Sequence, residues 1–170
     1  MVTTSSNIKV FPAARRIGSA DPFSRLMSES TIASIINRLI GSEGFIITSS
    51  DNAISSGVFE FNLFGYYIKI NDIASIISTL SSGTEIYATI FLETFQSGDL
   101  SYVELVGSDA DSNYNGVQFT TTVPADQTNK EKHYLKILEK VDGSWKIPAE
   151  SRIKFGRHDF SIDAIDGGEI

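Results

Sequence analysis

Two histidines are the first residues to consider for chemistry in this chain. His133 and His158 are far apart in the sequence, and neither belongs to a motif with the spacing of a nucleophile or a metal ligand. We therefore interpret both as surface or strand residues. The serines do not form a G-x-S-x-G elbow, and no Walker-type or Rossmann loop is present. With no cysteine either, the sequence predicts a protein without catalytic residues or a cofactor, and therefore not an enzyme.

The main candidate for a metal site is the stretch DADSNYNG. Asp111, Asn113 and Asn115, followed by a glycine, reproduce the first half of an EF-hand loop, in which oxygen ligands occupy alternate positions. The second half is missing, because Thr122 stands where the bidentate glutamate belongs. Asp, Asn and Gly are also common turn residues, so the sequence favours a polar loop between two strands and leaves calcium as a weak alternative.

Two further groups of side chains resemble parts of carbohydrate-active sites. Acidic residues near the C-terminus alternate with apolar ones, which is typical of the solvent-facing side of a strand rather than of a paired acid and base. These residues are Asp159, Asp163, Asp166 and Glu169. An aromatic run could form a platform for sugars, although alternating aromatics in a strand more often pack in a core. This run comprises Phe59, Phe61, Phe64, Tyr66 and Tyr67.

The stretch YLKILEKVDGSWKIPAESRIKF predicts a hairpin that contains the single tryptophan of the chain. Asp142 and the glycine after it are the residues of a type I′ turn, which needs positive φ at both central positions. Trp145 is then expected to pack across the hairpin near Lys140 and Leu138. Basic residues follow it, and on an acidic chain we expect them to contact an acidic neighbouring subunit. The predicted interaction residues are Trp145, Lys146, Arg152 and Lys154, together with Arg15 and Arg16 near the N-terminus.

Composition limits the partners that this protein can have. A chain of 170 residues with 41% hydrophobic residues can bury one sizeable core, which favours a single domain. The net charge of −7 disfavours nucleic acid as a partner, because binding its phosphates requires clustered Lys and Arg. No apolar run approaches the ~20 residues that cross a bilayer, and the N-terminus lacks the features of a signal peptide. We therefore expect synthesis in the cytoplasm and no membrane insertion.

The predicted elements form an α+β fold, mainly antiparallel β sheet or sandwich, with two short amphipathic helices. Apolar residues at steps of three and four predict helices from Ser30 to Ile40 and from Ile73 to Leu80. Alternating patterns predict strands at 59–63, 66–70, 85–95, 101–106, 116–123, 133–141, 144–147 and 160–165. The polar residues 1–29, interrupted by two prolines, predict an extended N-terminal arm before a β-rich domain at 30–170. Within the arm, Ile8, Val10 and Phe11 could add one strand to a neighbouring sheet edge.

Several of these stretches together resemble small virion structural proteins of tailed bacteriophages. They are FEFNLFGYYIKI, NGVQFTTT, the hairpin stretch quoted above and the closing AIDGGEI, which together make up 49 of the 170 residues. The similarity is to modules that attach fibres or decorate the baseplate or the head. It implies a non-enzymatic building block of the virion that forms homo-oligomers with its arm on a neighbour, and other virion subunits as partners. It identifies no individual binding residue.

Two alternative functions compete with this interpretation. A glycan-binding module would need Tyr66, Tyr67 and Trp145 exposed on a single face, where they could stack on sugars. A small polysaccharide hydrolase would need two carboxylates facing each other across one cleft. Burial of the three aromatic side chains would favour the building block over the glycan-binding module.

Overall fold

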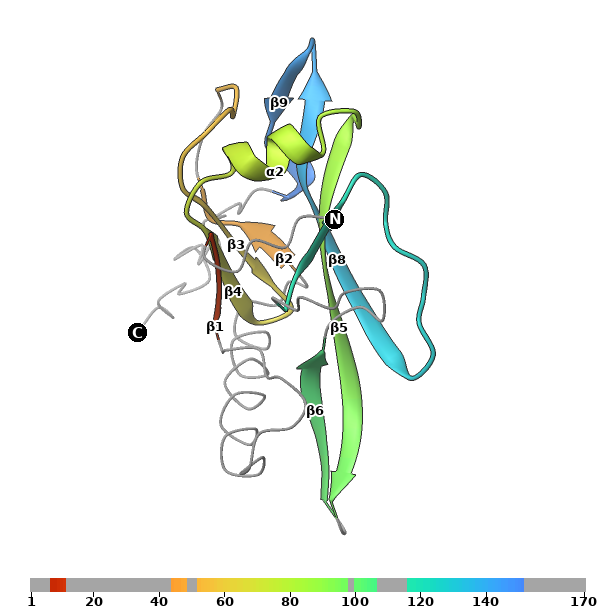
Figure 1. Ribbon diagram of the computed structural model, residues 1–170. Coiled ribbons are helices and arrows are strands. Elements are labelled where there is room, and N and C mark those ends of the chain that lie inside the picture. Colours follow the sequence, from red (N-terminus) through yellow and green to blue (C-terminus); the bar gives the residue numbers. More distant parts are fainter. Residues whose placement is uncertain (1–6, 12–43, 49–51, 98–99, 107–115, 152–170) are drawn as a thin grey trace, which may run out of the picture.

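The protein is built mainly from two antiparallel β-sheets (Figure 1). The computed structural model describes residues 7–11, 44–48, 52–97, 100–106 and 116–151. The prediction of a mainly antiparallel β fold is confirmed. No helix among these residues is long and apolar enough to cross a membrane.

Sheet A has four strands in the order β1-β4-β3-β2. These are β1 (Ile8–Phe11), β2 (Gly44–Ile46), β3 (Phe59–Leu63) and β4 (Tyr66–Ile70). The predicted β3–β4 hairpin is present, and its turn places Phe64 at φ 50° and Gly65 at φ 85°. Positive φ at both central positions is the requirement of a type I′ turn, which explains the glycine there. The sequence did not predict β2, which has only three residues and no clear alternation.

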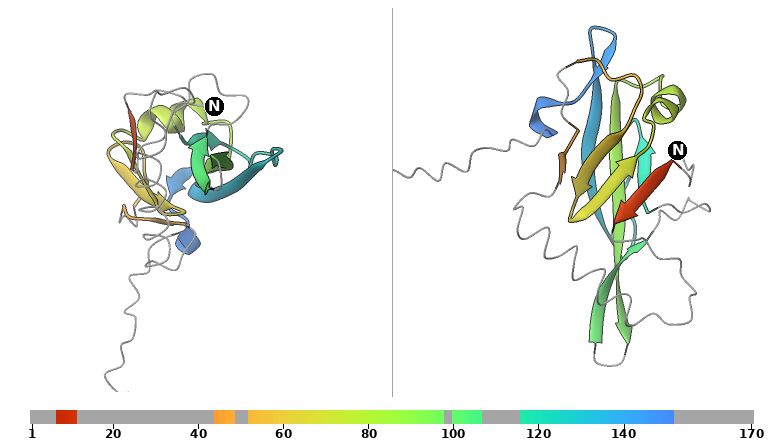
Figure 2. Two further views of the ribbon diagram at one scale, coloured as in Figure 1. Left: turned by 90° about the horizontal axis from the view of Figure 1, so that it is seen from below. Right: turned by 90° about the vertical axis from the view of Figure 1, so that its left-hand side faces the viewer.

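Sheet B has five strands, in the order β6-β5-β8-β9, with β7 also paired to β5. They are β5 (Glu85–Ser97), β6 (Leu100–Val106), β7 (Gln118–Thr120), β8 (Lys130–Val141) and β9 (Ser144–Lys146). All five overlap predicted strands, and β5, β6 and β8 extend beyond the predicted ranges. The β5–β6 hairpin extends away from the rest of the described body (Figures 1 and 2).

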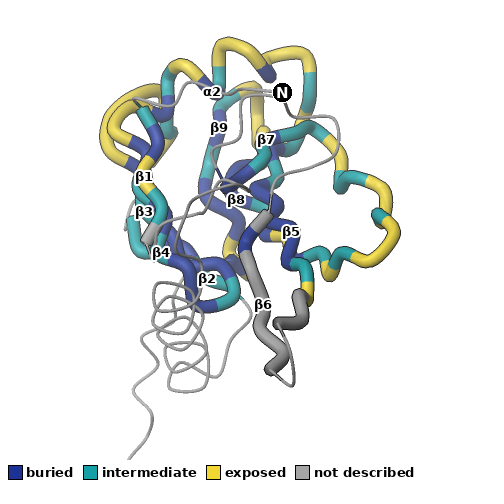
Figure 3. Tube along the Cα trace, turned by 60° about the horizontal axis from the view of Figure 1, so that its bottom comes forward, coloured by how far each residue is buried: buried dark blue, intermediate teal, exposed yellow. Residues whose placement is uncertain are grey.

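The two sheets pack face to face around one hydrophobic core (Figure 2). Period-two alternation places every second side chain of β3 and β4 on the inner face, where Phe61 and Ile68 are fully buried. Sheet B contributes Ile90, Phe119 and Ile137, which are also fully buried. Burial is concentrated on the strands, whereas the loops between them are mostly exposed (Figure 3).

Helical structure is limited in the described residues to two short elements. Helix α2 (Ala74–Thr79) occupies the second predicted helical segment, and its Ile76 is buried in the core. The 3-10 helix η1 (Ala149–Ser151) follows β9. The predicted helix at 30–40 and the predicted strand at 160–165 lie outside the described residues. The predicted arm also lies outside the described residues, apart from residues 7–11, of which β1 belongs to sheet A of its own chain.

Candidate functional site

The edge of β4 forms a docking site for the N-terminal strand. β1 pairs with β4 in antiparallel register, with Ile8 opposite Ile70 and Phe11 opposite Tyr67. Ile8 is buried at 6% exposure, and Val10 packs against the core. Lys9 points away from the core and is exposed. Apolar residues at alternate positions thus bind this segment to the sheet, as strand addition at a sheet edge requires.

Asn7 anchors β1 to the turn that leads into α2. Its Nδ2 donates hydrogen bonds to the carbonyl oxygen of Asp72 (2.7 Å) and to Oγ of Ser75 (2.8 Å). Its Oδ1 accepts a hydrogen bond from the backbone N–H of Asp72 (2.8 Å). The backbone carbonyl of Asn7 also accepts one from the N–H of Asn71 (2.8 Å). One side chain therefore uses both its donor and its acceptor to fix the end of the strand.

The turn that receives Asn7 is held in place by contacts of its own. Oδ1 of Asp72 accepts hydrogen bonds from the N–H groups of Gly57 (2.9 Å) and Ala74 (3.1 Å). The bond from Ala74, followed by the bond from Gly57, holds the pKa of the Asp72 carboxyl below its usual value. Gly57 has φ 93°, a conformation that favours glycine. We define the β1 dock as the β4 edge together with this turn at residues 71–75.

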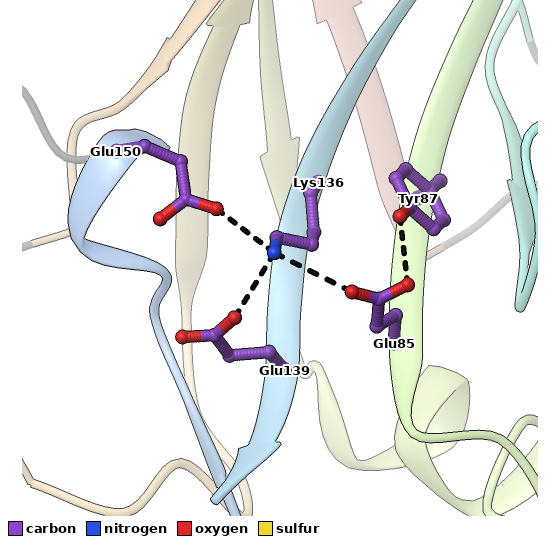
Figure 4. A network of polar contacts seen from close by, with 5 residues as sticks. All are labelled: Glu85, Tyr87, Lys136, Glu139 and Glu150. Atoms are coloured by element: carbon purple, nitrogen blue, oxygen red, sulfur yellow. Dashed lines mark hydrogen bonds and ion pairs between the residues drawn. The ribbon is translucent and has the colours of Figure 1, made fainter.

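A second polar cluster joins β5, β8 and η1 on the outer face of sheet B (Figure 4). Nζ of Lys136 lies 2.8 Å from Glu150, 3.0 Å from Glu139 and 3.4 Å from Glu85. Lys136 lowers the pKa of the Glu150 carboxyl, and the hydrogen bonds that Lys136 donates to Glu150 and Glu139 raise the pKa of Lys136. A general acid needs a carboxyl with a raised pKa, so Glu150 has the opposite tuning. The cluster is best explained as ion pairs that tie η1 to sheet B.

The predicted hairpin has the predicted geometry. Asp142 and Gly143 have φ of 51° and 77°, as a type I′ turn requires. Trp145 stands opposite Lys140 in the register, and Nζ of Lys140 lies 5.0 Å from the indole centroid. Trp145 is only 7% exposed and belongs to the core, so little of it is accessible to a partner.

The remaining predicted interaction residues are largely outside the described part of the chain. Lys146 is partly exposed on β9. Arg15, Arg16, Arg152 and Lys154 lie outside the described residues, as do the calcium candidates Asp111, Asn113 and Asn115 and the C-terminal carboxylates. Within the described residues, no group of three or more His, Cys, Asp or Glu side chains is arranged to hold a metal ion.

Three residues of the aromatic run and His133 are buried in the protein. Phe59 and Phe61 are fully buried and Tyr66 is 4% exposed, which confirms their interpretation as core residues. His133 is 8% exposed on β8, and its ring stacks on Phe64 at a centroid distance of 3.6 Å. It is therefore a buried strand residue. His158 lies outside the described residues.

Sequence reasoning missed the two residues that organise the polar contacts. Asn7 and its partner Asp72 are 65 positions apart, and no local pattern connects them. Lys136 appears as one more alternating polar residue of a strand, because its partners come from two other elements as well as from its own. In contrast, the Asn71-Asp72 pair before an apolar helical stripe is a visible helix-start signal.

The comparisons with known proteins gave no relative. No protein-family model matches the sequence, and no significant match was found among curated proteins or among solved structures.

Proposed function

We propose that this chain is a non-enzymatic assembly protein that functions through contacts between protein subunits. The observation that carries the proposal is the β1 dock, in which the body binds an N-terminal strand through a sheet edge and a dedicated side-chain anchor. Strand addition of this kind supplies affinity through the backbone and specificity through alternate side chains. The resemblance to phage virion proteins supports the same function and adds the setting, a fibre attachment, baseplate or head decoration module.

Within this proposal, residues 1–29 act as an arm and the basic residues as secondary contacts. Arg15 and Arg16 flank the strand on its C-terminal side, and the chain carries a net charge of −7. A basic segment on an acidic protein is complementary to the surface of a neighbouring copy, which favours correct register. Lys146, Arg152 and Lys154 are assigned the same role in the C-terminal part of the sequence.

The first test is the mass of the full-length protein in solution, measured by light scattering across concentration with and without calcium. We expect a defined oligomer whose mass does not change with calcium. A monomer at every concentration, alone and with its particle partners, would contradict the proposal. Deletion of residues 1–21 should abolish association. Because this deletion also removes β1 and uncovers the β4 edge, a circular dichroism spectrum is needed to show that the body remains folded.

Glycan binding is retained as a second candidate because of one exposed aromatic side chain. Tyr134 is 51% exposed on the outer face of sheet B, 6.3 Å from the ring of Tyr87, with Nζ of Lys132 5.9 Å from its own ring centroid. An exposed tyrosine with a polar neighbour can stack on a sugar. A glycan screen with the wild type and with Tyr134→Ala tests this function. Binding that Tyr134→Ala abolishes would favour it over assembly.

A further inference from the structure

We propose that the β1 dock accepts β1 from a second copy of this chain, so that two subunits exchange their N-terminal strands. This inference rests on the proposed assembly function and names the partner of the same site. In the structure described above, the dock is filled by β1 of its own chain. In the exchanged form, the contacts between β1 and the dock would be the same, but β1 would come from one copy and the dock from the other.

The position of β1 makes it separable from the body. Among the strands that the structure describes, it is the outermost one of sheet A and pairs only with β4. Its removal leaves the order β4-β3-β2, with the β3–β4 hairpin intact. A vacant β4 edge would then present unpaired N–H and C=O groups, which makes an exposed edge prone to pairing with another chain. The second copy of β1 is the strand that satisfies these groups in the register already observed.

The length of chain between β1 and β2 permits this exchange. Residues 12–43, 32 in all, connect the two strands. β1 and β2 lie at opposite edges of sheet A, so three strand spacings, roughly 15 Å in total, separate them. A connection of that length can span up to about 100 Å when extended. Chain length therefore does not require β1 to dock on its own body.

The dock recognises features that β1 of another copy would reproduce. The turn at 71–75 is fixed by Asp72 through Gly57 and Ala74, independently of β1. It offers an N–H and a carbonyl oxygen at the correct spacing for an asparagine side chain. Next to it, the sheet edge buries Ile8 and packs Val10. A strand with the pattern Asn-Ile-x-Val is matched at every position, and this chain supplies that strand.

Concentration decides which form is present. Linking two binding partners in one chain gives an effective concentration of the order of mM, and the contacts are the same in both forms. Dilute protein is then expected to keep its own strand, and exchange is expected where subunits are crowded on an assembling particle. Reciprocal exchange between two copies produces a closed dimer with equivalent contacts.

Engineered cysteines can detect the exchange directly, because the natural chain contains none. Lys9 and Lys69 are Cα partners in the β1–β4 pair, and both side chains point away from the core. Opposite Cα atoms in an antiparallel pair are about 4.5–5.5 Å apart, within the range of a disulfide. One full-length chain carries Lys9→Cys and a second, distinguishable by a mass tag, carries Lys69→Cys. The two are mixed in denaturant, refolded together at high concentration and oxidised.

Two controls define the outcome of this experiment. The double variant Lys9→Cys/Lys69→Cys, refolded and oxidised at high dilution, should form a bond within one chain, which verifies the register. A mixture of Lys9→Cys with Val141→Cys, an exposed position on β8, measures random collision. We expect the Lys9→Cys and Lys69→Cys mixture to give covalent heterodimer at least several-fold above the collision control.

The result that overturns strand exchange is a bond in the double variant without heterodimer above the collision level. Light scattering on the same samples separates the two proposals. If the protein still forms its oligomer, assembly stands and uses another surface. If it is also a monomer at every concentration, both proposals fail. Absence of the bond in the double variant would likewise overturn the exchange, because the register itself would be wrong.

Discussion

β1 and β9 are both short edge strands, yet their connections to the sheet differ. β1 has four residues and contributes the buried side chain of Ile8, and β9 has three residues and contributes the buried side chain of Trp145. β9 pairs with the strand that immediately precedes it, through a turn at Asp142 and Gly143. β1 instead pairs with β4, which is distant in the sequence, and Ile8 lies opposite Ile70. One edge is closed locally and the other by a distant segment.

This difference determines what each edge can do. A two-residue turn costs little chain entropy to close, so β9 can pair with β8 without closing a long loop. It is also fixed to the 52–58 loop, since the N–H of Ile54 donates to the carbonyl oxygen of Trp145 (2.7 Å). To reach its partner, β1 must close a long loop, which costs chain entropy. Its hydrogen bonds and apolar contacts with the dock offset this cost. The local edge completes the fold, whereas the distant edge is suited to a binding partner.

The largest expected effect is at the local edge. Trp145→Ala removes a buried indole and should lower the free energy of unfolding by about 3–5 kcal/mol. Denaturant unfolding measures the change, and the exposed neighbour Val141→Ala serves as the control, with a cost of less than about 1 kcal/mol. If the comparison is correct, the loss appears as global destabilisation with β1 still docked in the remaining folded protein. A Trp145→Ala variant that specifically releases β1 would break the distinction between the two edges.

At the distant edge, Ile8→Ala should lower the free energy of unfolding by about 2 kcal/mol, the lower end of the range for an aliphatic core residue. The cost is limited because β1 can separate from the body. The substitution therefore cannot remove more stability than the free energy of docking β1 provides. Hydrogen exchange should therefore accelerate first at β4, without acceleration at β8 and β9. Lys9→Ala, at the exposed position next to Ile8, should change stability by less than about 0.5 kcal/mol. Equal acceleration throughout both sheets would show that β1 is not separable.

The same contrast explains which parts of the fold the sequence could predict. The β8–β9 hairpin depends on a turn dipeptide and on alternation within one stretch, so its register and the contact of Trp145 with Lys140 were both predictable. The β3–β4 hairpin was predictable for the same reason. The strand character of residues 8–11 was also visible. Its partner was not, because no local rule connects Ile8 with Ile70.

The polar contacts were the least predictable part of the candidate site. The hydrogen bonds of Asn7 depend on the position of the turn at 71–75, which is held by the hydrogen bonds from Gly57 and Ala74 to Asp72. The ion pairs of Lys136 depend on η1 folding back over sheet B, which places Glu150 beside it. A basic cluster near Trp145 was predicted to be a contact surface, but Trp145 itself is largely covered by its own chain. Burial of a side chain is a property of the assembled sheets and not of its neighbours in sequence.

A smaller effect is expected from the anchor of β1. Asn7→Ala removes the three side-chain hydrogen bonds to Asp72 and Ser75, with an expected cost of about 1–2 kcal/mol because they are solvent-exposed. Combined with the cysteine pair, the variant should also reduce the yield of heterodimer. Ser78→Ala, on the exposed side of α2, is the matched control and should change neither quantity. An unchanged heterodimer yield for Asn7→Ala would mean that the sheet edge alone selects the strand.

The smallest expected effect is a pH dependence of stability that arises at the dock and not at the β8–β9 hairpin. The N–H groups of Ala74 and Gly57 lower the folded-state pKa of Asp72 below that of the unfolded chain, near 4. A lowered pKa stabilises the folded state above the unfolded pKa, and this contribution is lost as pH falls through the folded value. The wild type should therefore be more stable than Asp72→Asn at neutral pH, and the difference should shrink below about pH 4. Hydrogen exchange measured at several pH values should place this loss at β1 and β4, with β8 and β9 following only the global change. A difference between the two proteins that stays constant down to pH 2.5 would show that the charge of Asp72 does not hold the turn, and that the dock is shaped by packing alone.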